Sequence, residues 1–383
     1  MIAVEVNHER LYTRVRELCA LNAPSRHEQP VYTYLHRFWQ ERKDQGLEFE
    51  TVAVQDPSDT PNIIMRLKGI GEPLLLCSHM DTVPLPPGPV LLVETDGVLS
   101  TDGNSILGSD DRAGIALALE MVDLCLEHTN HPPLELVFTV QEELGCIGSA
   151  YLNRALFQSN TAINLDGETP VGTAITSAPQ KGRFTIRVNG VSAHAALQPQ
   201  LGQSAIRLAA EILLKLPHGQ LDPFTTANIG TIVGGSQTNV VCDLVTLTGE
   251  LRSFSSELYV SHRRLIDTLV TEHQMPEECS ADLEWEEVYA GFSLPETAAI
   301  VVRFKTACVE SGYNPHLLRS AGGGDANMLN SIGIPMIVFG MGMHHIHTTR
   351  EFLIWRELSS AAELLARMVF RTSICEHSDL GSN

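Results

Sequence analysis

The chain has 383 residues, 43% of them hydrophobic, and a formal net charge of −20 at pH 7. This hydrophobic fraction excludes a disordered chain, and the length predicts two or three domains. The acidic balance argues against nucleic acid and membranes as partners, because nucleic acid and anionic lipid both bind basic surfaces.

No apolar run approaches the roughly 18 residues that a membrane helix needs. The first residues, MIAVEVNHER, lack the basic and apolar regions of a signal peptide. The eight cysteines form no CxxC pair, a pattern typical of reduced and mostly buried thiols. We therefore expect a cytoplasmic protein without disulfides or a thiolate zinc site.

Helical and strand patterns alternate along the first 180 residues, which is typical of an α/β fold. The segment EPLLLCS is apolar enough to be a strand buried on both faces of a sheet. The predicted elements are helices at 9–23, 31–42 and 112–128, and strands at 61–67, 72–78, 134–140 and 161–167.

Between 180 and 291 the pattern changes to strand, helix, strand, strand, helix, strand. This order is that of a ferredoxin-like α+β unit with one face of the sheet covered. After 295 the pattern returns to helix, strand and helix, at 297–311, 335–342 and 355–372. We therefore predict one discontinuous α/β domain, 1–179 and 292–383, interrupted by an inserted module at 180–291.

Histidine and carboxylate side chains follow several of the predicted strands. His79 and Asp81 stand in SHMDTVP, directly after the apolar strand, and Asp166 stands at another strand end. Open α/β sheets place their ligands at such carboxyl ends. Asp81 suits a supporting role in which it fixes the tautomer of a metal-binding His79. Each segment alone also fits a capped strand end in contact with solvent.

Two acidic pairs and a histidine group complete the set. Asp110 and Asp111 precede a predicted helix, where acids also serve as caps. Glu142 and Glu143 follow a buried strand, so one can hold a metal while the other acts as general base. The third group is His344, His345 and His347, and the spacing does not say which of them is a ligand. Mixed histidine and carboxylate ligation without cysteine suits catalytic Zn²⁺, with Co²⁺ or Mn²⁺ as substitutes.

These segments together resemble the cocatalytic zinc peptidases, the family of peptidase T, carboxypeptidase G and succinyl-diaminopimelate desuccinylase. The resemblance spans nearly the whole chain, and the form of LGSDDRAG and QEELG is nearest to peptidase T. The matching segments are SHMDTVP, LGSDDRAG, QEELG, LDG, VSAHAALQPQLGQSAI, GGSQTNVV, GELRS, GGGDAN and HTTRE. The resemblance implies a zinc-exopeptidase catalytic domain with a mixed sheet flanked by helices, and an inserted lid or dimerisation domain.

The resemblance also implies roles for individual residues. One zinc ion would be bound by His79, Asp110 and Asp166, and the other by Asp110, Glu143 and His347, so that Asp110 bridges two zinc ions per subunit. Asp81 would orient His79, and Glu142 would be the general base. The peptide bond between Asp110 and Asp111 would be cis.

Four further residues are implied to contact substrate. His194 would stabilise the oxyanion, in its own or a partner's active site, while Asn239 and Arg252 would bind substrate and Gly323 would let the backbone approach it. The alternatives are a helix cap for His194, a turn for Asn239 and a surface pair with Glu250 for Arg252.

We therefore predict a zinc-dependent aminopeptidase that acts on tripeptides or similar short peptides. The insert is expected either to form a homodimer or to serve only as a lid. A carboxypeptidase or an N-acyl-amino-acid deacylase is the alternative within the family. A non-catalytic binding protein on the same scaffold is an alternative of another class, and the loss of Glu142 or a ligand would be its signature.

Overall fold

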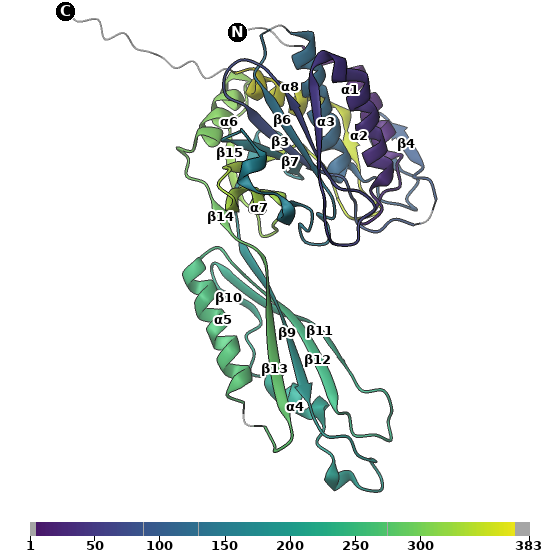
Figure 1. Cartoon of the computed structure of the whole chain (residues 1–383), viewed down its shortest axis with the longest axis vertical. Coiled ribbons are helices and arrows are strands. Elements are labelled where there is room, and N and C mark those ends of the chain that lie inside the picture. Colours follow the sequence, from purple (N-terminus) through teal and green to yellow (C-terminus); the bar gives the residue numbers. More distant parts are fainter. Residues whose placement is uncertain (1–4, 87, 129, 274, 372–383) are drawn as a thin grey trace, which may run out of the picture. The chain divides into compact units, whose positions relative to one another are not determined.

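The structure, a computed structural model, describes residues 5–86, 88–128, 130–273 and 275–371. The chain divides into two compact units. The larger unit contains Met1–Thr176, Ser293–Arg319 and Gly324–Asn383, and the smaller unit contains Ser177–Phe292 and Ser320–Gly323. Each unit is described by itself below, and Figure 1 shows the elements of both.

The larger unit is built on a nine-stranded mixed sheet in the order β1-β2-β6-β3-β7-β16-β8-β14, with β15 paired to β8. Its strands are β1 (Leu47–Val52), β2 (Asn62–Leu67), β3 (Leu74–His79), β6 (Leu134–Thr139), β7 (Ala162–Gly167), β8 (Thr173–Ala178), β14 (Phe292–Ser293), β15 (His316–Arg319) and β16 (Met336–Gly340). A separate sheet contains β4 (Leu92–Thr95), β5 (Val98–Thr101) and β17 (Leu353–Ile354).

The central strands β6, β3, β7 and β16 are parallel neighbours. Every residue of β3 and β6 is buried, as the unbroken apolar runs of the sequence predict for strands covered on both faces. Because these strands are parallel, their carboxyl ends meet at one edge of the sheet. The polar residues that end β3 and β7 or follow β6 are thereby brought together.

Among the described residues of the larger unit, six helices accompany this sheet (Figure 1). They are α1 (His8–Cys19), α2 (Gln29–Arg42), α3 (Ser109–Glu127), α6 (Ala299–Glu310), α7 (Asp325–Ser331) and α8 (Trp355–Phe370). Helix α3 is buried from Ser109 to Cys125, because it packs on β3 and β7 and against α1 and α8. A Cβ at Gly114 would lie 2.0 Å from the carbonyl oxygen of Leu165, so only glycine allows this approach to β7.

A buried charge network joins α1 to α3. Arg14 forms ion pairs with Glu120, at 3.1 Å, and with Asp123. We expect Arg14→Ala to lower the free energy of unfolding by about 3 kcal/mol, because it leaves buried carboxylates short of a partner. The urea midpoint measures this loss. Lys305→Ala is the control: its pair with Glu296 is exposed, and its loss is expected to cost below about 1 kcal/mol. Equal midpoint shifts would contradict the prediction.

The smaller unit is a five-stranded antiparallel sheet in the order β10-β11-β12-β9-β13. Helices α4 and α5 pack on β9 and β12, and Figure 1 shows α5 lying along these long strands. The bounds are β9 (Gln180–Asn189), β10 (Gly219–Asp222), β11 (Thr225–Gly234), β12 (Leu244–Ser253), β13 (Ser280–Tyr289), α4 (Ala205–Leu213) and α5 (Ser256–Thr271). The predicted ferredoxin-like arrangement is confirmed, and β10 is an additional edge strand.

The most apolar elements form where the sequence predicts them, whereas several others, most of them short, were not predicted. The unpredicted elements are β1, β4, β5, β8, β10, β14, β15, β17, α7 and the 3₁₀ turns Lys43–Gln45, Ser149–Tyr151, Arg154–Leu156 and Pro199–Leu201. Many have few residues and little apolar periodicity, so tertiary pairing determines them. The seven described cysteines are free thiols, and five of them are buried. Within the described residues, no helix is both long and apolar enough to cross a membrane.

Candidate metal centre

Five predicted ligands lie at one edge of the larger unit's sheet. His79 ends β3, Asp166 lies near the end of β7, and Glu143 follows β6. Asp110 stands at the start of α3, and His347 lies in the segment after β16. Residues as far apart in sequence as Asp110 and His347 are therefore neighbours in space.

These residues form two groups that share one carboxylate. The first contains His79, Asp110 and Asp166, and the second contains Asp110, Glu143 and His347; in each group the candidate ligand atoms lie within 4.8 Å of one another. The Nε2 atom of His79 lies 3.0 Å from Asp110 Oδ1 and 3.8 Å from Asp166 Oδ1.

The second group uses the other oxygen of Asp110. The Nε2 atom of His347 lies 2.9 Å from Asp110 Oδ2 and 2.9 Å from Glu143 Oε1. Asp110 therefore presents Oδ1 to one group and Oδ2 to the other, which is the arrangement of a carboxylate that bridges two metal positions. The side chains of His344 and His345 belong to neither group.

The backbone around Asp110 is tightly specified. Gly108 has a φ of 69°, a left-handed conformation that glycine favours, and the peptide bond between Asp110 and Asp111 is cis, as the resemblance implied. The carboxylate of Asp111 accepts hydrogen bonds from the backbone N–H of His79, at 3.1 Å, and of Gly114, at 3.2 Å. Asp111 therefore joins the end of β3 to the start of α3.

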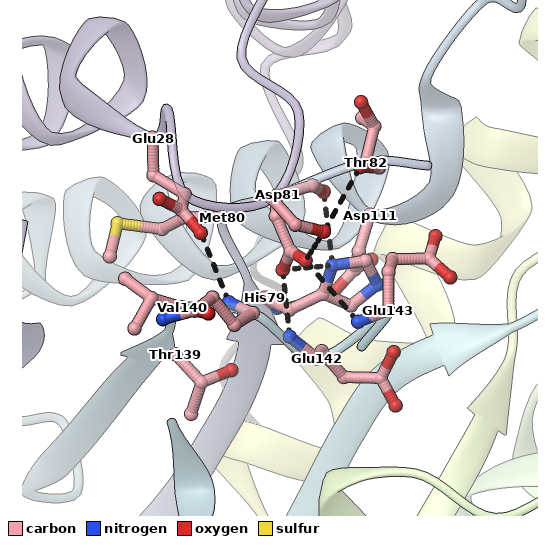
Figure 2. A network of polar contacts seen from close by, with 12 residues as sticks. Glu28, His79, Met80, Asp81, Thr82, Asp111, Thr139, Val140, Glu142 and Glu143 are labelled. Atoms are coloured by element: carbon pink, nitrogen blue, oxygen red, sulfur yellow. Dashed lines mark hydrogen bonds and ion pairs between the residues drawn. The ribbon is translucent and has the colours of Figure 1, made fainter. Parts of the chain in front are cut away.

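Asp81 holds the two glutamates as well as His79 (Figure 2). Its Oδ1 accepts a hydrogen bond from the backbone N–H of Glu142 at 3.0 Å, and its Oδ2 accepts one from that of Glu143 at 3.2 Å. Its Oδ1 also lies 3.4 Å from His79 Nδ1. Glu28 extends the series, because its Oε1 accepts from the backbone N–H of Gln141 at 3.1 Å. Two buried carboxylates thus fix three consecutive amides.

Glu142 belongs to neither of these two groups. Figure 2 shows its carboxyl group and that of Glu143 pointing in different directions. Its Oε1 accepts a hydrogen bond from the thiol of Cys146 at 3.5 Å, and Gly324 lies close, since a Cβ there would be 3.0 Å away. Together with Cys146 and Asp325, Glu142 forms a third carboxylate and thiol group beside the other two.

Burial and mutual repulsion shift the protonation of the carboxylates. Burial raises the pKa of Glu142 well above its usual value, and burial followed by the charge of Asp110 does the same for Asp166. Burial also acts on Asp110, but its contacts with His347 and His79 hold its pKa below the usual range. The bonds with Asp110 and Glu143 raise the pKa of His347 to about 10. Protons therefore balance this anionic cluster wherever no other cation is bound.

The other four predicted residues belong to the smaller unit. The segments of His194 and Asn239 pair there, because the N–H of Ala195 donates to the carbonyl of Asn239 at 2.9 Å. Arg252 binds both carboxylate oxygens of Glu250, at 2.9 and 3.2 Å, and donates to the carbonyl of Ala321 at 3.0 Å. A Cβ at Gly323 would lie 2.4 Å from the ring of Tyr289.

His194 caps a turn rather than a helix. Its Nδ1 accepts hydrogen bonds from the backbone N–H of Ala196 and of Leu197, each at 3.2 Å, whereas α4 begins after Ser204. Arg252 forms the pair with Glu250 that the sequence offered as its alternative. Its remaining bond to Ala321 ties this pair to the glycine-rich segment.

Sequence reasoning gave Asp111 only a possible cap and a cis peptide bond, and it assigned no role to three other buried acids of the site. Glu28, Asp111, Asp325 and Glu351 are at most 1% exposed. Asp111, Asp325 and Glu351 lie inside the motifs DDRAG, GGGDAN and HTTRE. Their position in these motifs is the sequence signal that could have indicated a role in the site. Glu28 stands outside every motif, and nothing in the sequence marks it.

Comparison with known proteins gives two family matches and several full-length relatives. The peptidase dimerisation domain family matches residues 180–278, and peptidase family M28 matches residues 62–210. The uncharacterized protein YqjE of Bacillus subtilis is 33% identical over 95% of this chain and 98% of its own. The structure of aminopeptidase PepT from Bacillus cereus is 31% identical with a TM-score of 0.85, and that of a tripeptidase from Staphylococcus aureus is 30% identical with a TM-score of 0.86. Each match covers 95% of this chain and 98% of the other.

Proposed function

We propose that this chain, which belongs to the peptidase T-like metallopeptidases, is an aminopeptidase that hydrolyses tripeptides and similar short peptides. The observation that carries the proposal is the pair of ligand groups sharing Asp110 at the carboxyl edge of the sheet. The relatives of at least 30% identity that span almost the whole chain include an aminopeptidase and a tripeptidase.

The donor set fits two divalent metal ions, which we assign as zinc. Histidine nitrogen and carboxylate oxygen without a cysteine ligand suit catalytic Zn²⁺, and Co²⁺ and Mn²⁺ accept the same donors. Oε1 of Glu143 is buried, and His347 Nε2, another proposed ligand atom, lies 2.9 Å from it. A buried carboxylate needs a cationic partner, which a metal ion bound by these two side chains would supply. Two ions held there would supply an activated water and polarise the scissile carbonyl.

The residues around the groups have distinct tasks in this proposal. His79, Asp110 and Asp166 hold one ion, and Asp110, Glu143 and His347 hold the other. Glu142 accepts a proton from the attacking water and returns it to the leaving amine. Glu142 belongs to neither of the groups that share Asp110, so its carboxylate is left to carry that proton between the two steps.

The smaller unit serves, in this proposal, as a lid and dimerisation module. We place the insert at 180–291, around the dimerisation-domain match at 180–278. The proposed homodimer forms through this insert in the cytoplasm. His194, Asn239, Arg252 and Gly323 are proposed to contact the peptide, and His194 supplies the oxyanion contact.

A comparison of blocked and free peptides tests the proposal. We expect a free tripeptide to be cleaved after its first residue at least about tenfold faster than the same peptide with an acetylated N-terminus, because an aminopeptidase binds the free amine. Mass spectrometry of the products identifies the cleaved bond. A chelator is expected to abolish the activity, and added zinc to restore it.

Other outcomes of this assay identify the alternatives. Faster cleavage of the acetylated peptide would indicate an N-acyl-amino-acid deacylase, and release of the last residue would indicate a carboxypeptidase. No cleavage of any peptide, together with no bound metal, would indicate a binding protein. Glu142 and all five proposed ligands are present, so the chain lacks the signature of that last class.

A further inference from the structure

A buried carboxylate outside the ligand groups joins two of the ligand-bearing segments. Glu351 lies four residues after His347, and its side chain reaches the start of α3. Its Oε2 accepts a hydrogen bond from the backbone N–H of Gly108 at 2.9 Å. Its Oε1 accepts three hydrogen bonds: from the N–H of Ser109 at 2.7 Å, from the hydroxyl of Ser109 at 2.6 Å and from the N–H of Asp110 at 3.3 Å. Three consecutive amides and a hydroxyl therefore converge on one side chain.

These contacts replace a salt bridge. Glu351 is 1% exposed, and no arginine, lysine or histidine among the described residues forms an ion pair with it within 4.0 Å. Backbone N–H groups stabilise a buried carboxylate, and the amides of Gly108, Ser109 and Asp110 do so for Glu351. Removing the side chain leaves those buried amides without their acceptor.

The two segments that Glu351 joins carry ligands of the second group. The N–H of Glu351 itself donates to the carbonyl of Thr348 at 3.0 Å, so its backbone is fixed to the turn that follows His347. His347 has a φ of 62°, which is uncommon for a residue with a side chain and requires support from its surroundings. A displacement of either segment changes the 2.9 Å separation between His347 Nε2 and Asp110 Oδ2.

We infer that Glu351 is a positioning residue: its carboxylate fixes the segment of Asp110 against that of His347 and thereby sets the affinity of the second metal position. This inference rests on the proposed function, because it presupposes two bound ions. A structural cap alone would stabilise the fold without distinguishing the second ion from the first. A selective loss of affinity for the second ion would therefore indicate a positioning role, and an equal loss for both ions would indicate a role in stability.

The test measures the zinc bound per chain in Glu351→Ala across a series of buffers with fixed free zinc. The full-length protein is dialysed at each concentration and its metal is counted by mass spectrometry. We expect the free zinc needed for the second equivalent to rise about 10- to 100-fold, while that for the first changes by less than about threefold. The first ion retains His79 and Asp166, which Glu351 does not touch. In peptide assays kcat is expected to fall more than KM rises.

Two further variants complete the test. In Glu351→Gln the amide keeps one oxygen acceptor but turns an NH₂ group toward a backbone donor, so a smaller loss of second-site affinity is expected; this variant decides the question if Glu351→Ala does not fold. Glu357→Gln is the matched control. The Oε2 atom of Glu357 lies 2.7 Å from His344 Nε2, and this pair is partly exposed and lies outside both ligand groups. This variant is expected to bind both ions like wild type.

The outcomes separate this inference from the proposed function. Two zinc ions bound by wild type and by both Glu351 variants at the same free concentrations would overturn the positioning role and leave the proposed function standing. Equal weakening of both ions, with a lower melting temperature, would also overturn it in favour of a structural cap. A wild type that takes up fewer than two ions would overturn the dinuclear site and the inference together.

Discussion

Glu142→Gln is expected to lower kcat for a tripeptide by about 10²- to 10⁴-fold while both metal ions and the fold are retained. The amide cannot accept a proton from water, but it fills the same volume. The backbone N–H of Glu142 donates to Asp81, and this bond does not depend on the side chain. The two groups that share Asp110 do not contain Glu142, so we expect both ions to stay bound without its carboxylate. Steady-state kinetics, a metal count and circular dichroism on one preparation measure the three quantities.

A carboxylate far from the site provides the control for Glu142→Gln. Glu127→Gln makes the same chemical change at the last residue of α3, whose first turn carries Asp110. A helix of this length places Glu127 about 25 Å from Asp110. Turnover of Glu142→Gln within tenfold of that control would refute the role of general base. Loss of bound metal would instead assign Glu142 a part in metal binding.

The parallel core of the larger unit could be predicted because its signal is local. The runs LLLCSH and LELVFT are apolar without interruption, and in the structure every residue of both is buried. The edge pairing of β1 with β2 could not be predicted in the same way, because β1 alternates buried and exposed residues only weakly. Its register follows from contact with β2, which the sequence of β1 does not encode alone.

The role of Asp81 shows what spacing alone leaves out. The two-residue step from His79 predicts a contact between them, and Asp81 Oδ1 does lie 3.4 Å from His79 Nδ1. The same carboxylate also binds the amides of Glu142 and Glu143, about 60 residues further along the chain. Such a contact depends on the parallel pairing of β3 with β6. The motif identifies Asp81 as a candidate, but its bonds to the amides of Glu142 and Glu143 become visible only in the folded sheet.

Glu28 and Glu351 show where residue-level reasoning ends. A buried acid that accepts backbone hydrogen bonds needs no particular neighbour in sequence, because its partners are amides that every residue except proline carries. Glu28 binds the amide of Gln141, and Glu351 binds those of Gly108, Ser109 and Asp110. The sequence therefore gives the ligands, whose chemistry is distinctive, more readily than the groups that position them.

His347→Ala is expected to reduce the bound zinc from two ions to one and to lower kcat/KM by about 10²-fold or more, since even a supporting residue of a metal site can contribute that much. Only His347 of the three clustered histidines reaches the second group, and the sequence alone left this choice open. Its side chain is 44% exposed, so its removal leaves no buried cavity. Metal counting and peptide kinetics on the purified variant measure both effects.

His345→Ala is the matched control, because it removes the same side chain two residues away, where the ring lies against Phe352 and outside both ligand groups. This variant is expected to keep two zinc ions and turnover within about threefold of wild type, since exposed side chains away from a site have small effects. Two ions bound by His347→Ala would remove His347 from the ligand set. One ion bound by His345→Ala as well would mean that the whole turn between β16 and α8, rather than one imidazole, creates the second site.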